Sequence, residues 1–440
     1  MRPPALHPLV APVGLGALVG LAVAGDPRLP VLLAGAGVGL WAALRRPELL
    51  VGLMFASILM DRAGGTGATI ARLPVTASKL SVLGSLGLWA LHGLLRREPV
   101  VRLHPVLLGL GGMVLSTWVA IAWSSDFDAG RFALLGAGMV AVLTGLVYAI
   151  LAERPLEPLA RGMAAVLLAA LAVSIVGGTT YSDTGRATGT FGDPNEWAAL
   201  VLLVSPVILG VLIDDPHPLA RLLRLGLMGL VPLAVLASGS RSALMVGALI
   251  TPGLVWALRG RQGELLLCAA LGLVAAPLAI DLEVALERLL RLFGRAGGAA
   301  LVEDSSLDER GELLRQGLEL FSRHWGMGAG PGRFAVATGF LSVNEGYRPA
   351  HNTYLELASE QGVFGLGVAA VAAGLVVGTL RRAWQLAPDD RHRHRVLGAA
   401  SGLFAVGLMA ATLGLLTFSV IYLTLGIVLA VTHQASRGER

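Results

Sequence analysis

The stretch Tyr347-Arg-Pro-Ala-His-Asn-Thr-Tyr-Leu-Glu-Leu-Ala-Ser-Glu-Gln-Gly-Val-Phe-Gly-Leu366 joins the longest polar segment of the chain to an apolar run. The run extends to about residue 380, which is long enough to cross a hydrocarbon core of roughly 30 Å. His351 and Asn352 are therefore expected where water meets lipid. A histidine there can exchange protons with a substrate hydroxyl while the helix behind it holds it in place. The junction predicts a polytopic membrane protein with chemistry at its outer surface.

The composition of the chain supports the membrane class. Of the 440 residues, 55% are hydrophobic and 14% are charged, and the mean hydropathy is +0.72. The formal net charge of +5 is carried mostly by arginines in loops expected to face the cytoplasm, so it predicts no nucleic-acid partner. The single cysteine, Cys268, lies in an apolar run, which excludes an internal disulfide and predicts a structural, unreactive thiol.

Apolar runs recur along nearly the whole chain. They predict an all-α polytopic membrane protein with about 12–14 transmembrane helices, the lower number applying if short early runs merge or lie in the interface. The first run follows Arg2 and ends at Ala22-Val-Ala24, as a signal peptide does, but an uncleaved span is expected because it completes the charge pattern. The runs lie at residues 9–25, 29–44, 48–60, 78–95, 104–123, 132–151, 162–180, 195–213, 222–238, 242–258, 264–280, 352–380, 396–412 and 414–432.

Arginines assign a side to each loop, because loops that face the cytoplasm are enriched in basic residues. They fall on one side of the predicted spans throughout, which predicts that this side and both termini face the cytoplasm. The arginines concerned are Arg45, Arg46, Arg96, Arg97, Arg102, Arg154, Arg161, Arg221, Arg224, Arg259, Arg261, Arg381, Arg382, Arg391, Arg393 and Arg395.

One outward-facing loop, residues 281–351, is long enough for a small extracytoplasmic subdomain. Residues 281–295 predict an amphipathic helix at the interface, which Gly297 and Gly298 end. The capping box Ser306-Leu-Asp-Glu309 predicts a second helix that runs to about residue 324.

Three regions are expected along the chain, since no repeat or linker marks a separate soluble domain. Residues 1–180 hold the N-terminal transmembrane helices. Residues 181–380 hold a core that includes the long loop, and residues 381–440 hold a cytoplasmic loop and the last two spans.

The second helix of the long loop carries an arginine on its apolar face. The residues expected on that face, at spacings of three and four, are Leu307, Arg310, Leu314, Leu318 and Phe321. A buried guanidinium needs an anionic partner, which makes Arg310 a candidate functional residue. The alternative is a local ion pair with one of the acidic residues Glu303, Asp304 and Glu309. A solvated pair is expected between Arg315 and Glu319.

Two further candidates face the same side as Arg310. Ser238-Gly-Ser-Arg241 forms a minimal outward turn between two spans, and its arginine is either functional or a snorkelling anchor. His351 is either a proton-transferring group or a hydrogen-bonded residue that caps the following helix. In the loop before residue 195, Pro194 is expected near the first turn of a helix, and Arg186 and Asn195 are either functional or loop-shaping.

Two motifs resemble functional sites, but structural roles are expected for them. Gly326-Met-Gly-Ala-Gly-Pro-Gly332 resembles a phosphate-cradling loop, but no strand precedes it, so a flexible or close-packed turn is expected. Arg391-His-Arg-His-Arg395 resembles a metal or nucleic-acid tract, but its place on the basic side favours a membrane anchor.

These motifs, in this order, resemble the O-antigen ligase and Wzy-type polymerase superfamily. The resemblance covers about residues 186–366. It rests on Gly185-Arg186 with Thr188-Gly-Thr-Phe-Gly-Asp-Pro-Asn195, Ser238-Gly-Ser-Arg241, Arg310 with Gly328-Ala-Gly-Pro-Gly-Arg-Phe334, and His351-Asn352 with Tyr354-Leu355 and Glu360-Gln-Gly-Val-Phe-Gly365.

The resemblance implies a metal-independent, inverting glycosyltransferase with a GT-C-like membrane fold and no cofactor. Its donor would be a glycan on undecaprenyl diphosphate, used at the outer face of the membrane. Arg241 and Arg310 match arginines that hold the diphosphate, and His351 matches the histidine proposed to activate the acceptor hydroxyl. Arg186, Asn195, Asn352 and Glu360 are expected to help bind substrate.

The predicted function is polymerisation of repeat units of a surface polysaccharide, either O-antigen or exopolysaccharide. The nearest alternative is a ligase that moves finished polysaccharide onto lipid A core or another acceptor. A lipid or glycan transporter is the distant alternative, because repeated halves and midplane polar residues are not evident. The expected partners are the lipid-linked donor, a glycan or lipid acceptor, membrane lipids, a flippase and a chain-length regulator.

Overall fold

The computed structural model describes part of the chain. The described residues are 44–61, 68–70, 73–75, 77–124, 127–176, 187–189, 191, 193–268, 305–337, 350–416 and 418–437. Outside them lie the span predicted at residues 9–25, all but the last residue of the span predicted at 29–44, and most of the one at 264–280. The helix predicted at 281–295 and Arg186 also lie outside them.

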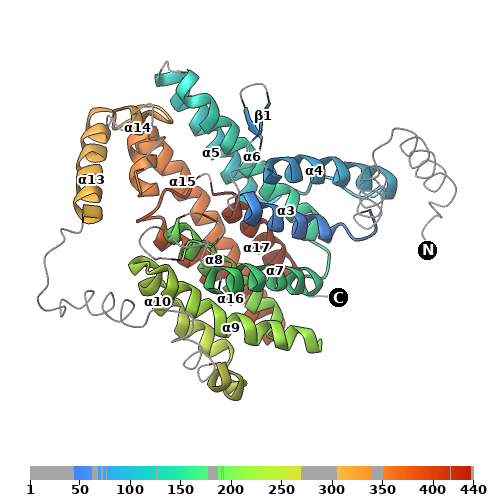
Figure 1. The fold of residues 1–440 in the computed structure, drawn as a ribbon. Coiled ribbons are helices and arrows are strands. Elements are labelled where there is room, and N and C mark those ends of the chain that lie inside the picture. Colours follow the sequence, from blue (N-terminus) through green and yellow to red (C-terminus); the bar gives the residue numbers. More distant parts are fainter. Residues whose placement is uncertain are drawn as a thin grey trace, which may run out of the picture.

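Every predicted span that falls among the described residues is a helix (Figure 1). The all-α fold class is thus confirmed, with one short hairpin of β1 (Ala68–Ile70) and β2 (Leu73–Val75) beside the helices. The helices are α3 (Glu48–Asp61), α4 (Ala77–Arg96), α5 (Pro105–Ser124), α6 (Phe127–Leu151), α7 (Glu157–Val176), α8 (Pro194–Leu212), α9 (Pro218–Ser238), α10 (Arg241–Ala257), α13 (Ser305–Arg323), α14 (Arg333–Ala337), α15 (Thr353–Leu386), α16 (Asp390–Met409) and α17 (Ser419–Arg437).

Seven of these described helices are long and apolar enough to cross a membrane: α5, α6, α7, α8, α9, α15 and α17. The other four predicted spans are α3 and α10, which are shorter, and α4 and α16, which fall outside this group despite 20 residues each. The total of 12–14 spans therefore stays a prediction.

Helix α8 forms the centre of the bundle, where α16 and α17 lie against it (Figure 1). In the most apolar stretch of 18 residues in α8, 89% of the residues are buried, because other helices pack around it. Glycines let α16 approach very closely: a Cβ on Gly398 would lie 2.3 Å from the carbonyl oxygen of Pro206, and one on Gly402 would lie 2.3 Å from that of Leu203. Small residues four apart are typical of tight helix pairs in membranes.

This contact predicts that Gly402→Val destabilises the protein by roughly 1–3 kcal/mol, because the added side chain pushes two packed backbones apart. Gly374→Val is the matched control, since a Cβ at Gly374 in α15 meets nothing within 4 Å. Thermal unfolding in detergent measures both variants. Equal unfolding temperatures for the two variants would contradict the close contact.

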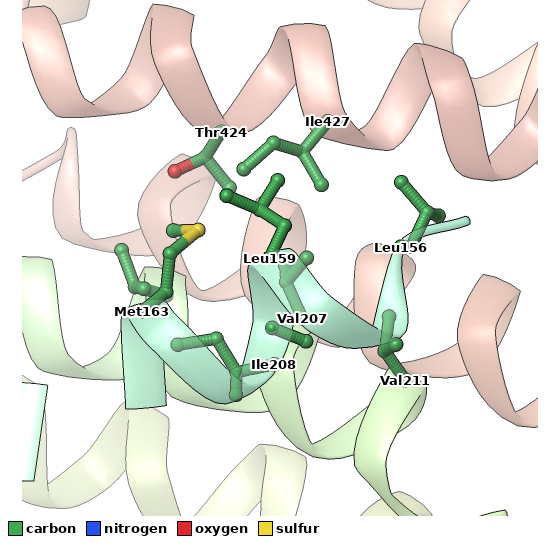
Figure 2. A pocket seen from close by; sticks show the side chains of 10 residues that line it. Leu156, Leu159, Met163, Val207, Ile208, Val211, Thr424 and Ile427 are labelled. Carbon is green, nitrogen blue, oxygen red and sulfur yellow. The ribbon is translucent and has the colours of Figure 1, made fainter. Parts of the chain in front are cut away.

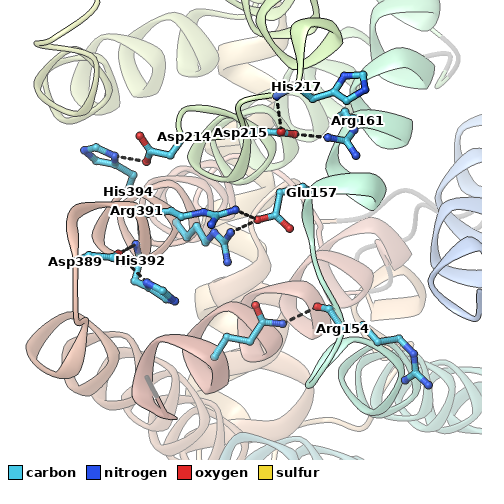
Figure 3. A network of polar contacts seen from close by, with 12 residues as sticks. Arg154, Glu157, Arg161, Asp214, Asp215, His217, Asp389, Arg391, His392 and His394 are labelled. Carbon is cyan, nitrogen blue, oxygen red and sulfur yellow. Dashed lines mark hydrogen bonds and ion pairs between the residues drawn. The ribbon is translucent and has the colours of Figure 1, made fainter. Parts of the chain in front are cut away.

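Charged loops are cross-linked at one end of the bundle (Figure 3). In the loop from α8 to α9, Asp215 binds Arg161 of α7 at 2.8 Å and Asp214 binds His394 of α16 at 2.7 Å. Glu157 at the start of α7 binds both Arg391 and Arg395.

The segment before α5 and the last turn of α17 lie at the same end and are joined there by ion pairs. Glu153 pairs with Arg102 at 2.6 Å and with Arg437 at 3.2 Å. The hydrogen bond from the Arg102 guanidinium holds the pKa of the Glu153 carboxyl below its usual value. Arginines that the sequence assigned to one side thus meet at one end of the structure.

The tract at residues 391–395 differs from its prediction as a simple anchor. His392 and Arg395 are buried, and their partners are Asp389 and Glu157. A charge among packed helices is stable only when it is paired, so this tract joins α16 to α7 rather than merely facing lipid head groups.

Candidate functional site

The predicted site segments lie at the opposite end of the bundle, where contacts join them one to the next. The loop before α8 reaches the turn between α9 and α10, because the backbone N–H of Ala187 donates to the carbonyl of Ala237 at 2.9 Å. The same loop reaches the connection between α16 and α17, where the rings of Phe191 and Phe418 meet edge to face with centroids 5.3 Å apart.

The connection between α16 and α17 in turn holds the start of α15. The Thr353 hydroxyl donates to the carbonyl of Leu413 at 2.6 Å and accepts from the N–H of Leu415 at 2.8 Å. One residue on, the Tyr354 hydroxyl donates to the carbonyl of Gly407 at 2.6 Å. The start of α15, just after His351, is therefore fixed to α16 and to the connection that follows α16.

His351 itself has a left-handed backbone conformation, with φ of 49°. Asn352, not His351, caps α15, because its Oδ1 accepts from the N–H groups of Tyr354 and Leu355 at 3.0 and 3.1 Å. The sharp turn leaves the His351 side chain partly exposed, whereas Ala350 before it is buried. The capping role that was the alternative for His351 therefore belongs to Asn352.

Ala350 packs into a small apolar cluster with Leu313 of α13, Phe334 of α14 and Leu355 of α15. Gly317 of α13 lies so close to Leu355 that a Cβ there would lie 2.6 Å from that side chain. The segment before His351 is thereby held against the helix that carries Arg310.

The predicted apolar face of α13 is wrong by about one residue. Leu314 and Leu318 are 46% and 53% exposed, whereas Leu313 and Gly317 are buried against α15. Arg310 nevertheless lies on the buried stripe, one turn before Leu313, and is partly buried. The predicted pair of Arg315 and Glu319 is present at 3.5 Å, and Arg315 also binds Glu312.

Arg241 is the first residue of α10, and its side chain is exposed. The turn before it is compact: Gly239 ends α9 with φ of 57°, and the Ser240 hydroxyl accepts from the N–H of Ala243. Ser238 and Ser240 are both fully buried, so the turn has little freedom to move. A guanidinium at the positive end of a helix favours an anionic partner.

The loop from Gly326 to Gly332 is a close-packed turn, in line with the sequence. It lies in a break of α15 at Gly362, whose φ of 64° and ψ of −163° are not helical. The N–H groups of Ala329 and Gly330 donate to the carbonyls of Ser359 and Glu360 at 2.9 and 3.0 Å.

Hydrogen bonds also run from the broken helix to the loop. The N–H groups of Val363 and Phe364 donate to the carbonyls of Trp325 and Gly326 at 2.8 and 3.2 Å. The loop thus replaces the hydrogen bonds that an unbroken α15 would make within itself, and it clamps the segment of α13 and α14 onto α15.

Two buried polar side chains flank the break. Glu360 accepts from the N–H of Phe334 at 3.1 Å, so its carboxylate lies beneath the loop. Gln361 accepts from the Ser116 hydroxyl at 2.9 Å and donates to the Thr117 hydroxyl at 3.3 Å, which ties α15 to α5. Sequence reasoning missed Gln361, although two adjacent hydroxyls in the apolar run at 104–123 were a signal for a polar contact.

Asn195 lies in the first turn of α8, and Pro194 is the first helical residue as predicted. The cap is Asp193, whose Oδ1 accepts from the N–H groups of Asn195 and Glu196 at 2.7 and 3.0 Å. The Asn195 side chain is partly exposed. The contacts therefore bring together the segments that hold Arg241, Arg310 and His351, with Asn195 at their border, while Arg186 lies outside the described residues.

A cavity apart from these segments lies among α7, α8 and α17, and its lining is too apolar to bind a sugar or a phosphate (Figure 2). Its single polar lining group is the Thr424 hydroxyl, and the remaining lining is apolar. The lining residues that Figure 2 labels are Leu156, Leu159, Met163, Val207, Ile208, Val211, Thr424 and Ile427.

The Thr424 hydroxyl is buried and has no hydrogen-bond partner within the part of the chain that the structure describes. Thr424→Val is expected to raise stability by about 1 kcal/mol, because it keeps the shape and removes a buried polar group without a partner. Thermal unfolding in detergent measures the change. Thr432→Val is the control, since the Thr432 hydroxyl donates to the carbonyl of Leu429 at 3.0 Å and little gain is expected. A lower unfolding temperature for Thr424→Val would contradict this account.

The helical bundle, with seven described helices able to cross a membrane, defines a multi-pass membrane protein. Residues 225–370 match the family model described as O-antigen ligase. This part of the chain is thus similar to the O-antigen ligase family, which confirms the resemblance predicted from its motifs. The matched residues include Arg241, Arg310 and His351. No curated protein matches the chain.

Proposed function

We propose that the protein is a membrane glycosyltransferase that acts on undecaprenyl-diphosphate-linked glycan at the outer face of the cytoplasmic membrane. The observation that carries the proposal is the joining of the Arg241, Arg310 and His351 segments at the end of the bundle opposite the arginine-rich loops. By the positive-inside tendency, the arginine-rich end faces the cytoplasm and the site faces outward.

The chemistry of glycosyl transfer matches these side chains. Negative charge builds on the departing diphosphate, and guanidinium groups stabilise it because they offer planar, permanently charged donors to phosphate oxygens. Arg241 and Arg310 serve this role without a metal ion. His351 removes the proton of the acceptor hydroxyl, and a single displacement then inverts the anomeric carbon.

The remaining site residues have supporting roles in the proposal. The Oδ1 atom of Asn352 is occupied by its cap, so its amide N–H₂ is the group that donates to a sugar. Asn195, in the first turn of α8, and Arg186 bind substrate. Glu360 contributes indirectly. It accepts a hydrogen bond from the N–H of Phe334, and this bond helps to hold the segment of α13 in place.

The proposed reaction is polymerisation of repeat units of a surface polysaccharide. About fourteen apolar runs, more than the twelve usual in ligases, support a polymerase. The ligase reaction is the second candidate, because the matching family model is described as O-antigen ligase.

Surface glycan from a strain that lacks this protein tests the proposal. Single repeat units capping the acceptor are expected for a polymerase, and long polymer stranded on the lipid carrier is the result for a ligase. Complementation with the wild-type chain restores the normal pattern. Unchanged glycan in the strain without the protein would overturn both.

A further inference from the structure

A second site of interest lies at the arginine-rich end, where α10 and α15 both flank α16. The indole rings of Trp256 in α10 and Trp384 in α15 lie with centroids 6.2 Å apart. The guanidinium of Arg259 lies over the Trp256 ring, 4.5 Å from its centroid. Such a contact holds a cation in place while its N–H groups stay open to an anion.

Both helices carry an exposed valine, tryptophan and arginine near this end. On α15, Val377, Arg381 and Trp384 follow at spacings of four and three, so they share one face. Val377 is 63% exposed and Trp384 is 37% exposed. At the end of α10, the exposed Val255 and Trp256 precede Arg259 by four and three residues. Apolar surface therefore leads to tryptophan and arginine at the end of each helix.

The arginines of this face lack the carboxylate partners that other arginines at the same end have. Among the described residues, no carboxylate forms an ion pair with Arg259, Arg381 or Arg382, and all three side chains are exposed. Elsewhere at the same end, Arg391 and Arg395 share Glu157. The face thus combines unbalanced positive charge with aromatic and aliphatic surface.

We infer that Trp256, Arg259, Arg381, Arg382 and Trp384 form a binding site for the phosphate head group of an anionic phospholipid. The guanidinium groups bind the phosphate, the indoles lie at head-group depth, and the acyl chains follow Val255 and Val377 into the bilayer. The aliphatic surface selects a lipid over a free phosphate ester. This inference does not depend on glycosyl transfer.

Native mass spectrometry of the purified full-length protein, titrated with phosphatidylglycerol, tests the site. The triple variant Arg259→Gln, Arg381→Gln, Arg382→Gln is expected to bind this lipid about 100-fold more weakly, at roughly fivefold per arginine near a charged membrane surface. Phosphatidylcholine with the same acyl chains is expected to bind both proteins equally weakly. Glycerol phosphate, the head group without chains, is expected not to bind.

A matched control variant removes three exposed arginines that already have carboxylate partners: Arg315, Arg323 and Arg437. It is expected to bind phosphatidylglycerol within about twofold of the wild type. Wild-type affinity in the first variant, an equal loss in the control variant, or binding of glycerol phosphate as tight as that of the lipid would each overturn the inference. Thermal unfolding of both variants without lipid verifies that they fold.

Discussion

The His351→Asn variant is expected to lose about 10²–10⁴ of the rate of glycan transfer while it unfolds at the wild-type temperature. Asparagine cannot remove a proton from an acceptor hydroxyl at neutral pH. It does tolerate the left-handed backbone conformation at this position, where φ is 49°. Alanine is a poorer choice, because strain in the turn would mix a structural loss with a chemical one.

Transfer by the purified protein in detergent, from an undecaprenyl-diphosphate glycan to its acceptor, measures this loss. His324→Asn is the matched control: His324 is an exposed histidine just after α13, and among the hydrogen bonds described only its backbone contacts the Gly326–Gly332 loop. Near-normal transfer by His351→Asn would remove His351 as the base. Equal losses in both variants would show a general effect of replacing histidines.

The Gly362→Ala variant is expected to destabilise the protein by roughly 2–6 kcal/mol. The backbone angles at Gly362 belong to a region that only glycine adopts readily. A Cβ there would also lie 2.3 Å from the carbonyl oxygen of Gly326 and 2.6 Å from the amide nitrogen of Gly328. The loop would be forced out of the break in α15, and both sets of hydrogen bonds would be lost.

Limited proteolysis and thermal unfolding together measure this effect. Cleavage within α13 and α14 is expected to become much faster in Gly362→Ala, because the clamp that holds them is gone. Gly374→Ala, farther along α15, is the control: its Cβ meets nothing within 4 Å, and a small gain in stability is expected. Wild-type protection in Gly362→Ala would mean that the break does not hold the loop.

Much of the fold could be predicted from the sequence, because a hydrocarbon environment permits few backbone arrangements. Apolar runs such as residues 104–123 and 195–213 became α5 and α8 within a few residues of their predicted ends. Hydropathy alone does not show which helix lies at the centre. The central place of α8 depends on close approach at Gly398 and Gly402, and the sequence pattern alone does not identify the partner of those glycines.

The candidate site was predicted as separate segments, and only the fold joins them. The positions of Arg241, Arg310 and His351 made them candidates, and the resemblance of the motifs added their roles. Contacts such as that of Ala187 with Ala237 depend on how helices pack. The face of α13 was misplaced because Gly317 carries no apolar side chain, although it lies on the most tightly packed stripe. A periodic pattern of apolar side chains identifies a helix face, but it does not reveal that the missing side chain of Gly317 leaves room for Leu355.

The composition of α16 has a consequence for how the protein is made. This helix is not among the seven that are apolar enough to cross a membrane by themselves, and its partners Glu157 and Asp214 belong to earlier parts of the chain. Synthesis proceeds from the N-terminus, so α7 and α8 are already present when α16 leaves the ribosome. A half-polar helix then enters a place that offers it counter-charges and a close-fitting backbone. The early helices thus act as the template on which α16 is inserted.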